Sequence, residues 1–169
     1  MRRSLTALAV AVLALTLGGC AVPVESKLPE YKIQAEQLRE DIAAQLPEGI
    51  TVGEPYISSE VRFETESGAG DSSDSPAYWR VLDGRNLTGE PGTSEDAATV
   101  LGDYLIAEGW SQKEAERTVG RGVTDAYRLE PGWYVEISWA TSEDGMAETL
   151  DILVLSPTTT RGEKPPANG

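Results

Sequence analysis

Apolar residues recur along this chain with two different periods, and these periods predict which segments are helical and which are extended. Between residues 29 and 46 they recur every three or four positions, as on one face of a helix. These positions are Tyr31, Ala35, Leu38, Ile42 and Leu46. Pro29 suits the first turn of such a helix, and Pro47 with Gly49 ends it.

A second helix is predicted over residues 94–108. Thr93 or Ser94 is the expected N-cap, and Gly109 followed by Trp110 is typical of a helix C-terminus. Its apolar stripe comprises Ala97, Leu101, Tyr104 and Leu105. We expect both helices to pack on a core. For the first helix the alternative is a position flat on a membrane surface, which its acidic polar face disfavours.

Strands are predicted where apolar residues alternate with polar ones or form short runs. They span residues 50–57, 60–66, 77–82, 111–119 as an exposed edge, 124–129, 133–140 and 149–155. Turns are expected at Asp83-Gly84 and, as a type II turn, at Pro131-Gly132. Residues 67–76 are rich in Gly, Ser and Asp, which indicates a loop.

The sequences of two of these strands also predict which of their faces are covered by other parts of the protein. Residues 133–140 place Trp133, Val135, Ile137 and Trp139 on one face, which we expect to be core; the alternative is an aromatic groove for a sugar or a peptide. Residues 149–155 are apolar almost throughout, as in a strand covered on both faces. Together the elements predict an α+β fold: a mostly antiparallel sheet of about six strands with two helices packed on one face.

The first twenty residues follow a different pattern. Arg2 and Arg3 precede an apolar run over residues 5–17, which is typical of an export signal. The run is too short to cross a membrane, because a spanning helix needs ~20 apolar residues. A twin-arginine signal is only a partial match, so the general secretory route is favoured.

Leu17-Gly18-Gly19-Cys20 resembles the lipobox of bacterial lipoproteins. The resemblance implies that residues 1–19 are a signal peptide, that Cys20 becomes the lipidated first residue, and that the mature chain is held on the extracytoplasmic face of the cell membrane. The alternative is an ordinary secretory signal ending in a free thiol; Cys20 is the only cysteine, so it has no disulfide partner within the chain. In its overall composition the chain is similar to small actinobacterial lipoproteins.

These observations divide the chain into four parts: the signal peptide, a lipidated Cys and tether at 20–27, one domain at 28–157 and a disordered tail at 158–169. The formal charge is −14, and removal of Arg2 and Arg3 would leave 12 basic against 28 acidic residues, or −16. Such a surface repels phosphates, so no nucleic-acid partner is expected.

The available chemistry is narrow. The chain has no His and its one Cys is assigned to the lipid, which excludes Ser-His-Asp triads, Cys-His dyads and the common zinc sites. No catalytic residue, metal site or cofactor is predicted. A calcium site that includes Asp71 and Asp74 is the alternative for the 67–76 loop, although the Glu and Gly positions of an EF-hand are missing.

Three functions remain. The favoured one is a non-enzymatic binding or interaction module at the cell envelope, whose partner is a protein, peptide, glycan or small ligand. The second is an accessory factor of a membrane protein complex. The third is an enzyme that uses paired carboxylates, which requires two acids from different strands, such as Glu136 and Asp151, to converge in a cleft with raised pKa.

Overall fold

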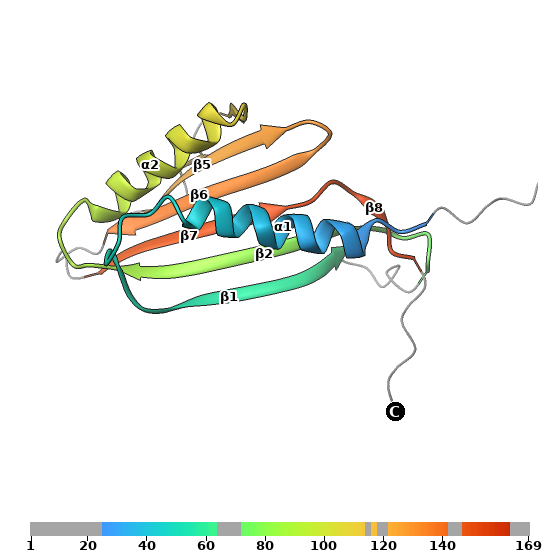
Figure 1. The fold of residues 1–169 in the computed structure, drawn as a ribbon, viewed down its shortest axis with the longest axis horizontal. Coiled ribbons are helices and arrows are strands. Elements are labelled where there is room, and N and C mark those ends of the chain that lie inside the picture. Colours follow the sequence, from blue (N-terminus) through green and yellow to red (C-terminus); the bar gives the residue numbers. More distant parts are fainter. Residues whose placement is uncertain (1–24, 64–71, 114–115, 118–121, 142–146, 163–169) are drawn as a thin grey trace, which may run out of the picture.

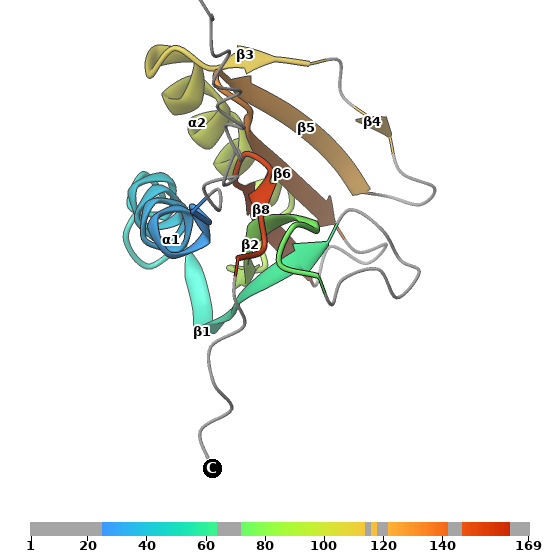
Figure 2. The ribbon, with the colours of Figure 1, turned by 90° about the vertical axis from the view of Figure 1, so that its right-hand side faces the viewer.

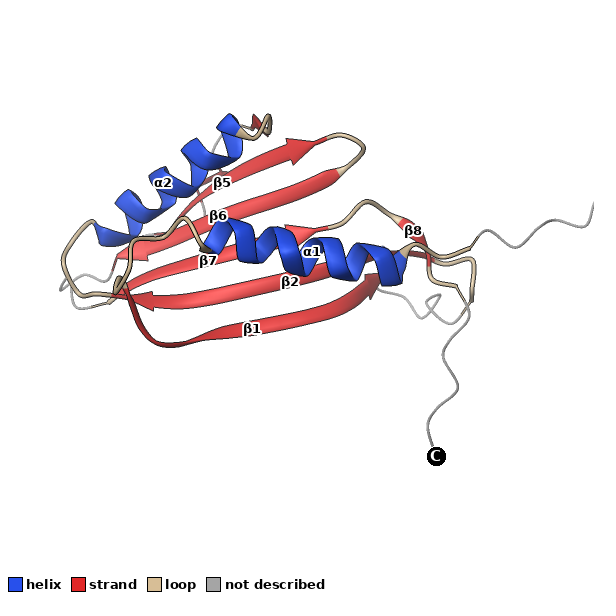
Figure 3. Ribbon diagram, viewed as in Figure 1, coloured by secondary structure: helices blue, strands red, loops and turns tan. Residues whose placement is uncertain are grey.

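The computed structural model describes residues 25–63, 72–113, 116–117, 122–141 and 147–162. The elements are α1 (Leu28–Ala43), β1 (Thr51–Phe63), β2 (Pro76–Leu87), α2 (Thr93–Ala107), β3 (Ser111–Gln112), β4 (Glu116–Arg117), β5 (Gly122–Leu129), β6 (Trp133–Thr141), β7 (Glu148–Leu155) and β8 (Thr159–Thr160). The strands form one antiparallel sheet in the order β1-β2-β7-β6-β5-β3, with β4 beside β5 and β8 beside β2. Both described helices lie on one face of this sheet (Figures 1 and 3), which confirms the predicted α+β class.

Side-chain alternation separates the face under the helices from a face that no described helix covers (Figure 2). On β7 the residues under the helices are fully buried: Leu150, Ile152 and Val154. On its other face Leu153 and Leu155 are half-buried and Asp151 is exposed. The prediction of a strand covered on both faces is wrong, because β7 is central in the hydrogen-bonded sheet but has a helical layer on one side only.

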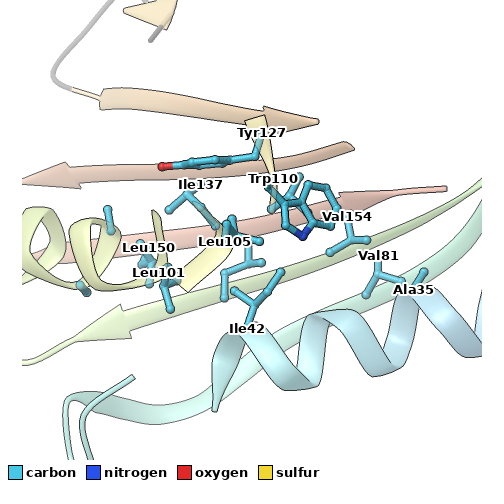
Figure 4. Packing of buried hydrophobic residues seen from close by; sticks show 14 of the residues in the cluster. Ala35, Ile42, Val81, Leu101, Leu105, Trp110, Tyr127, Ile137, Leu150 and Val154 are labelled. Carbon is cyan, nitrogen blue, oxygen red and sulfur yellow. The ribbon is translucent and has the colours of Figure 1, made fainter. Parts of the chain in front are cut away.

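The core lies between the helices and the covered face (Figure 4). Ile42 of α1 and Leu105 of α2 contribute to it together with Val135 and Ile137 of β6. Trp133 and Trp139 pack at its margin and are half-buried. The prediction that both helices dock on the core is confirmed, and the prediction that this face of β6 is core is confirmed for Val135 and Ile137 but only in part for Trp133 and Trp139.

One close contact sets the depth of α2 over β5. The hydroxyl of Tyr127 lies where a side chain at Gly102 would begin, so only glycine lets the helix approach so closely. Burial, with added contributions from Asp125 and Asp103, raises the pKa of Tyr127 to about 12. Tyr127 is therefore a neutral core residue at physiological pH.

The C-terminus of α2 is capped as predicted. Gly109 has a φ of 89°, its N–H donates to the Ile106 carbonyl at 3.0 Å, and the N–H of Trp110 donates to the Leu105 carbonyl at 3.0 Å. This is a Schellman motif, with Trp110 buried beneath it. The N-terminal prediction is wrong: Gly92 is the N-cap and makes no side-chain cap, while Thr93 already belongs to the helix.

Two predicted breaks in the sheet are absent. Residues 50–57 and 60–66 were expected as separate strands, but β1 continues without interruption to Phe63 because Ser58 and Ser59 pair with Leu82 and Val81 of β2. Its irregularity lies earlier, between Val52 and Tyr56. The remainder of the second predicted strand, 64–66, lies outside the described residues.

The expected turn at Asp83-Gly84 is likewise wrong. Both residues lie inside β2, where Asp83 is paired with Ile57 on one side and Ile152 on the other. A strand with partners on both sides keeps its extended backbone through a dipeptide that would favour a turn elsewhere.

At the other edge of the sheet the predicted hairpin is confirmed, because β5 pairs with β6. The edge strand expected over 111–119 is present only as the two-residue strands β3 and β4, which both pair with β5; residues 114–115 and 118–119 lie outside the described part of the chain. The hairpin turn is not the predicted type II turn, because the N–H of Gly132 donates to the Leu129 carbonyl at 3.0 Å and the turn therefore runs from Leu129 to Gly132. Pro131 is thus the third residue of the turn, whereas type II favours Pro in the second position.

The two ends of the described chain lie together. The Ser26 hydroxyl donates to the Thr160 carbonyl at 2.6 Å, and the Lys27 N–H donates to the Thr159 hydroxyl at 3.3 Å. The expectation of a disordered tail from residue 158 is wrong for β8, which pairs with Pro76–Ala77 of β2. Residues 163–169 lie outside the described part of the chain.

Candidate functional site

A groove of about 330 Å³ lies between the two helices, on the covered side of the sheet. It is lined by Gln34, Leu38 and Asp41 of α1, by Tyr104 and Glu108 at the end of α2, and by Trp110, Leu129 and Trp133 beyond it. The groove exists because α1 packs mainly on β2 and β7 while α2 packs mainly on β6 and β7, and Figure 1 shows that the helices do not run parallel.

Aromatic side chains dominate the apolar lining of the groove. Trp110 is buried, while Tyr104 and Trp133 are half-buried and present part of their rings to the groove. Tyr31 of α1 meets Trp133 edge to face, with ring centroids 5.7 Å apart and planes inclined by 73°. This contact fixes the orientation of the Trp133 ring at one side of the groove.

The charged lining is acidic at the C-terminal ends of both helices. Asp41 lies in the last turn of α1 and Glu108 is the C-cap of α2, and neither helix has a basic residue in its last turn. Helix C-termini carry partial negative charge and favour cations, so both carboxylates stand where the dipole disfavours them. Gln37 donates to Asp41 at 2.8 Å, but in the described part of the chain no Lys or Arg forms an ion pair with either acid.

The titration of Tyr104 reflects this arrangement. Burial raises the pKa of the Tyr104 hydroxyl, and the charges of Glu108 and Asp41 raise it further. The carboxylate of Asp41 on α1 and that of Glu108 at the end of α2 therefore both act on the Tyr104 hydroxyl. The hydroxyl stays protonated and can serve as a hydrogen-bond donor inside the groove.

A second pair of acids is enclosed by the fold. Asp83 is fully buried, and its two oxygens accept hydrogen bonds from Arg85 at 2.9 and 2.8 Å. Arg39 of α1 lies 3.7 Å from the same carboxylate, so the cluster ties the helix to β2. The Arg39 Nε is buried without a hydrogen-bond partner among the described residues. The charge of Asp83 is compensated by the guanidinium groups of Arg85 and Arg39, so the cluster has a structural role.

Glu148 at the start of β7 is the other enclosed acid. It accepts hydrogen bonds from the Ser94 hydroxyl at 2.5 Å, the Ser94 N–H at 2.9 Å and the Thr141 hydroxyl at 3.2 Å, and the Gly92 N–H lies at 3.4 Å. Burial opposes its ionisation, but these donors prevail and lower the pKa of Glu148. Glu148 therefore caps the N-terminus of α2 from 54 residues away, which no local sequence signal could indicate.

The pair suggested for an enzyme, Glu136 and Asp151, lies on the face opposite the groove. Glu136 pairs with Leu153 and Asp151 pairs with Ser138, so the two acids are diagonal neighbours. Asp151 is exposed as a residue, but its carboxylate lies against Gly84; this local burial, and the charge of Asp83 behind it, raise the pKa of Asp151. Neither acid lines the groove.

Other predicted site residues fall outside the structure or away from the groove. Leu17, Gly18, Gly19 and Cys20 of the lipobox and Asp71 of the loop are outside the described residues, and Asp74 is exposed in a turn. Within the described ranges, no group of three or more acidic or Cys side chains could hold a metal ion, and no helix is long and apolar enough to span a membrane.

The sequence predicted the elements that build the groove but not the groove itself. Tyr104 and Leu38 appeared as members of apolar stripes, and Trp110 as a helix cap. The acids Asp41 and Glu108 carried a usable signal, because each falls in a helix C-terminal turn where a basic residue is favoured. No protein-family model matches the chain, and no curated protein or solved structure is significantly similar to it.

Proposed function

We propose that this protein is a lipid-anchored, non-enzymatic binding module on the extracytoplasmic face of the cell membrane, and that the groove between α1 and α2 is its binding site. The observation that carries the proposal is the groove lining: half-buried aromatic rings beside two carboxylates that no described basic residue balances. The enclosed acids Asp83 and Glu148 are each satisfied by several donors of the fold, whereas Asp41 and Glu108 lie at helix ends that disfavour negative charge. A ligand that supplies positive charge would give this placement a function.

The anchor is proposed on the lipobox Leu17-Gly18-Gly19-Cys20. A diacyl lipid on Cys20 gives lasting attachment, because two chains bury many CH₂ groups at ~0.8 kcal/mol each. Ser26 and Lys27 bond to β8, so the free tether ends before Ser26 and reaches about 20 Å when extended. This reach exceeds the ~8 Å over which charges interact at physiological salt, so the acidic domain can stand clear of the headgroups.

The anchor is also compatible with the second candidate, an accessory factor of a membrane protein complex. In both cases the partner is an envelope component that comes to the membrane surface. The two candidates differ in whether the partner remains bound during purification from native membranes.

The anchor is tested by Cys20→Ser in the full chain. We expect the substitution to abolish labelling by a clickable palmitate analogue and to leave an unprocessed precursor. If the variant is still cleaved and labelled like the wild type, the lipid anchor is wrong.

The groove is tested by placing a photo-crosslinking amino acid at Gln34, which lines it, and at Glu54, an exposed residue of β1 outside it. In native membranes we expect one discrete adduct from position 34 and none from position 54. The adduct should disappear when Cys20→Ser removes the anchor. Equal adducts from both positions, or none from position 34, would show that the groove is not the binding site.

A further inference from the structure

We propose that the groove recognises an arginine side chain on a basic segment of the partner protein, with the guanidinium between the aromatic rings and the carboxylates of Asp41 and Glu108. This inference rests on the proposed function and names the chemistry of its ligand. It is argued from charge complementarity, from the state of the aromatic rings and from the size of the groove.

The first argument is electrostatic. Asp41 and Glu108 come from different helices, line the same groove and lie at the negative ends of both helix dipoles. Four sources of negative potential thus converge on one site. The only described hydrogen bond to either carboxylate is donated by the neutral amide of Gln37. A cation in the groove would compensate all four, whereas an anionic ligand would be repelled by them.

The second argument is a contrast among aromatic residues. Outside the groove, three rings are covered by cations: Trp79 by Lys32 at 5.6 Å, Tyr134 by Arg128 at 5.1 Å and Phe63 by Arg161 at 5.2 Å. In the described part of the chain, no such pair involves the groove residues Tyr104 and Trp133. The groove therefore presents rings that can accept a cation from another molecule.

The third argument is size and shape. A volume of about 330 Å³ is at the lower end of the ~300–1,000 Å³ typical of ligand sites, so it suits a side chain better than a large ligand. The rim residues Gln34, Asp41 and Glu108 are exposed, so a peptide backbone can remain outside while its side chain enters. Arginine fits better than lysine because its planar guanidinium stacks on rings and donates to two carboxylates at once.

The test uses the full lipidated protein in nanodiscs of a neutral lipid, with Gly-Leu-Arg-Leu-Gly, amidated at its C-terminus and labelled with an uncharged fluorophore, as the probe. Two matched probes carry citrulline or lysine in place of arginine; citrulline keeps the planar shape and loses the charge. Fluorescence anisotropy should show saturable binding of the arginine probe. We expect the citrulline probe to bind at least about tenfold more weakly, and the lysine probe to fall between them.

The matched variants separate the groove from the general acidity of the surface. Asp41→Asn/Glu108→Gln should weaken the arginine probe by about tenfold or more. Glu54→Gln/Glu90→Gln removes the same charge from exposed positions outside the groove and should leave the affinity within about twofold. Thermal melts of both variants verify that each remains folded.

Several outcomes would overturn the inference. Equal losses in the two double variants would mean that net charge alone attracts the probe. Equal binding of the citrulline probe would mean that the groove does not read charge, and equal binding of the lysine probe would remove the preference for arginine. If the Gln34 crosslink persists unchanged in Asp41→Asn/Glu108→Gln, the binding-module proposal stands and the arginine inference fails.

Discussion

Two regions of this molecule each contain a pair of carboxylates, and the two pairs differ in their burial and in the donors around them. Beneath the helices, Asp83 and Glu148 are buried and each is surrounded by donors. At the groove, Asp41 and Glu108 are exposed, lie at helix C-termini and have no basic partner among the described residues. The interior pair is explained by folding, whereas the groove pair lies where folding disfavours it.

The contrast separates structural acids from candidate functional ones in a chain with 28 acidic residues. Composition cannot distinguish them, because every Asp and Glu contributes the same formal charge. Their surroundings can. An acid that the fold uses should cost stability when it is neutralised, whereas an acid kept for a ligand should cost binding and not stability.

The largest expected effect is at Asp83. Replacement by Ala leaves Arg85 in a largely buried site without its counter-charge, while Arg39 keeps only its contact with the exposed Glu40 at 3.1 Å, so the free energy of unfolding should fall by about 3–5 kcal/mol. Urea denaturation at neutral pH measures this loss. Asp74→Ala, at an exposed turn, is the matched control and should change stability by less than about 0.5 kcal/mol. A loss below about 1 kcal/mol for Asp83→Ala would contradict the claim that the interior acids stabilise the fold.

Glu148→Gln should have an intermediate effect. The amide cannot accept all the hydrogen bonds that the carboxylate receives at the start of α2, so we expect a loss of about 1–3 kcal/mol at neutral pH. The pKa of Glu148 is lowered in the folded protein, so its contribution is present above the ordinary glutamate pKa of 4.5 and is lost as pH falls through the folded value. The difference between wild type and variant should therefore shrink below about pH 4.5. A difference that is constant with pH would contradict the capping role.

The smallest expected change in stability is at the groove, and its sign is reversed. Asp41→Asn/Glu108→Gln removes two charges from unfavourable helix ends and should leave the protein as stable as before or more stable, by about 0.3–1 kcal/mol for each site. The pKa of Tyr104 should fall toward its usual value, because both charges contribute to raising it. Thermal melts and NMR titration of the tyrosines measure the two effects. A clear loss of stability would show that Asp41 and Glu108 stabilise the fold as the interior pair does, and the contrast between the two pairs would be wrong.

The sequence predicted which segments are helices and strands more reliably than it predicted which segments lie next to each other in the fold. The stripes of both helices, the Gly109-Trp110 cap and the alternation around Val135 and Ile137 depend on residues close together in the chain, so their periods could be recognised directly. The predictions that failed depended on distant partners. Asp83-Gly84 favours a turn locally, but β1 and β7 on either side hold it extended. Thr93 or Ser94 suited an N-cap, but Ser94 bonds instead to Glu148.

The α+β class, the amphipathic helices, the strong negative charge and the lipobox-like motif at Cys20 can be recognised in the sequence alone, because each is a property of composition or of short-range order. Which acids are enclosed and which line a groove follows only from the folded arrangement. That choice depends on how α1 and α2 cross the sheet and bring Asp41 and Glu108 to the same site. Burial and distance set the energy of a charge, and neither can be read from its position in the chain.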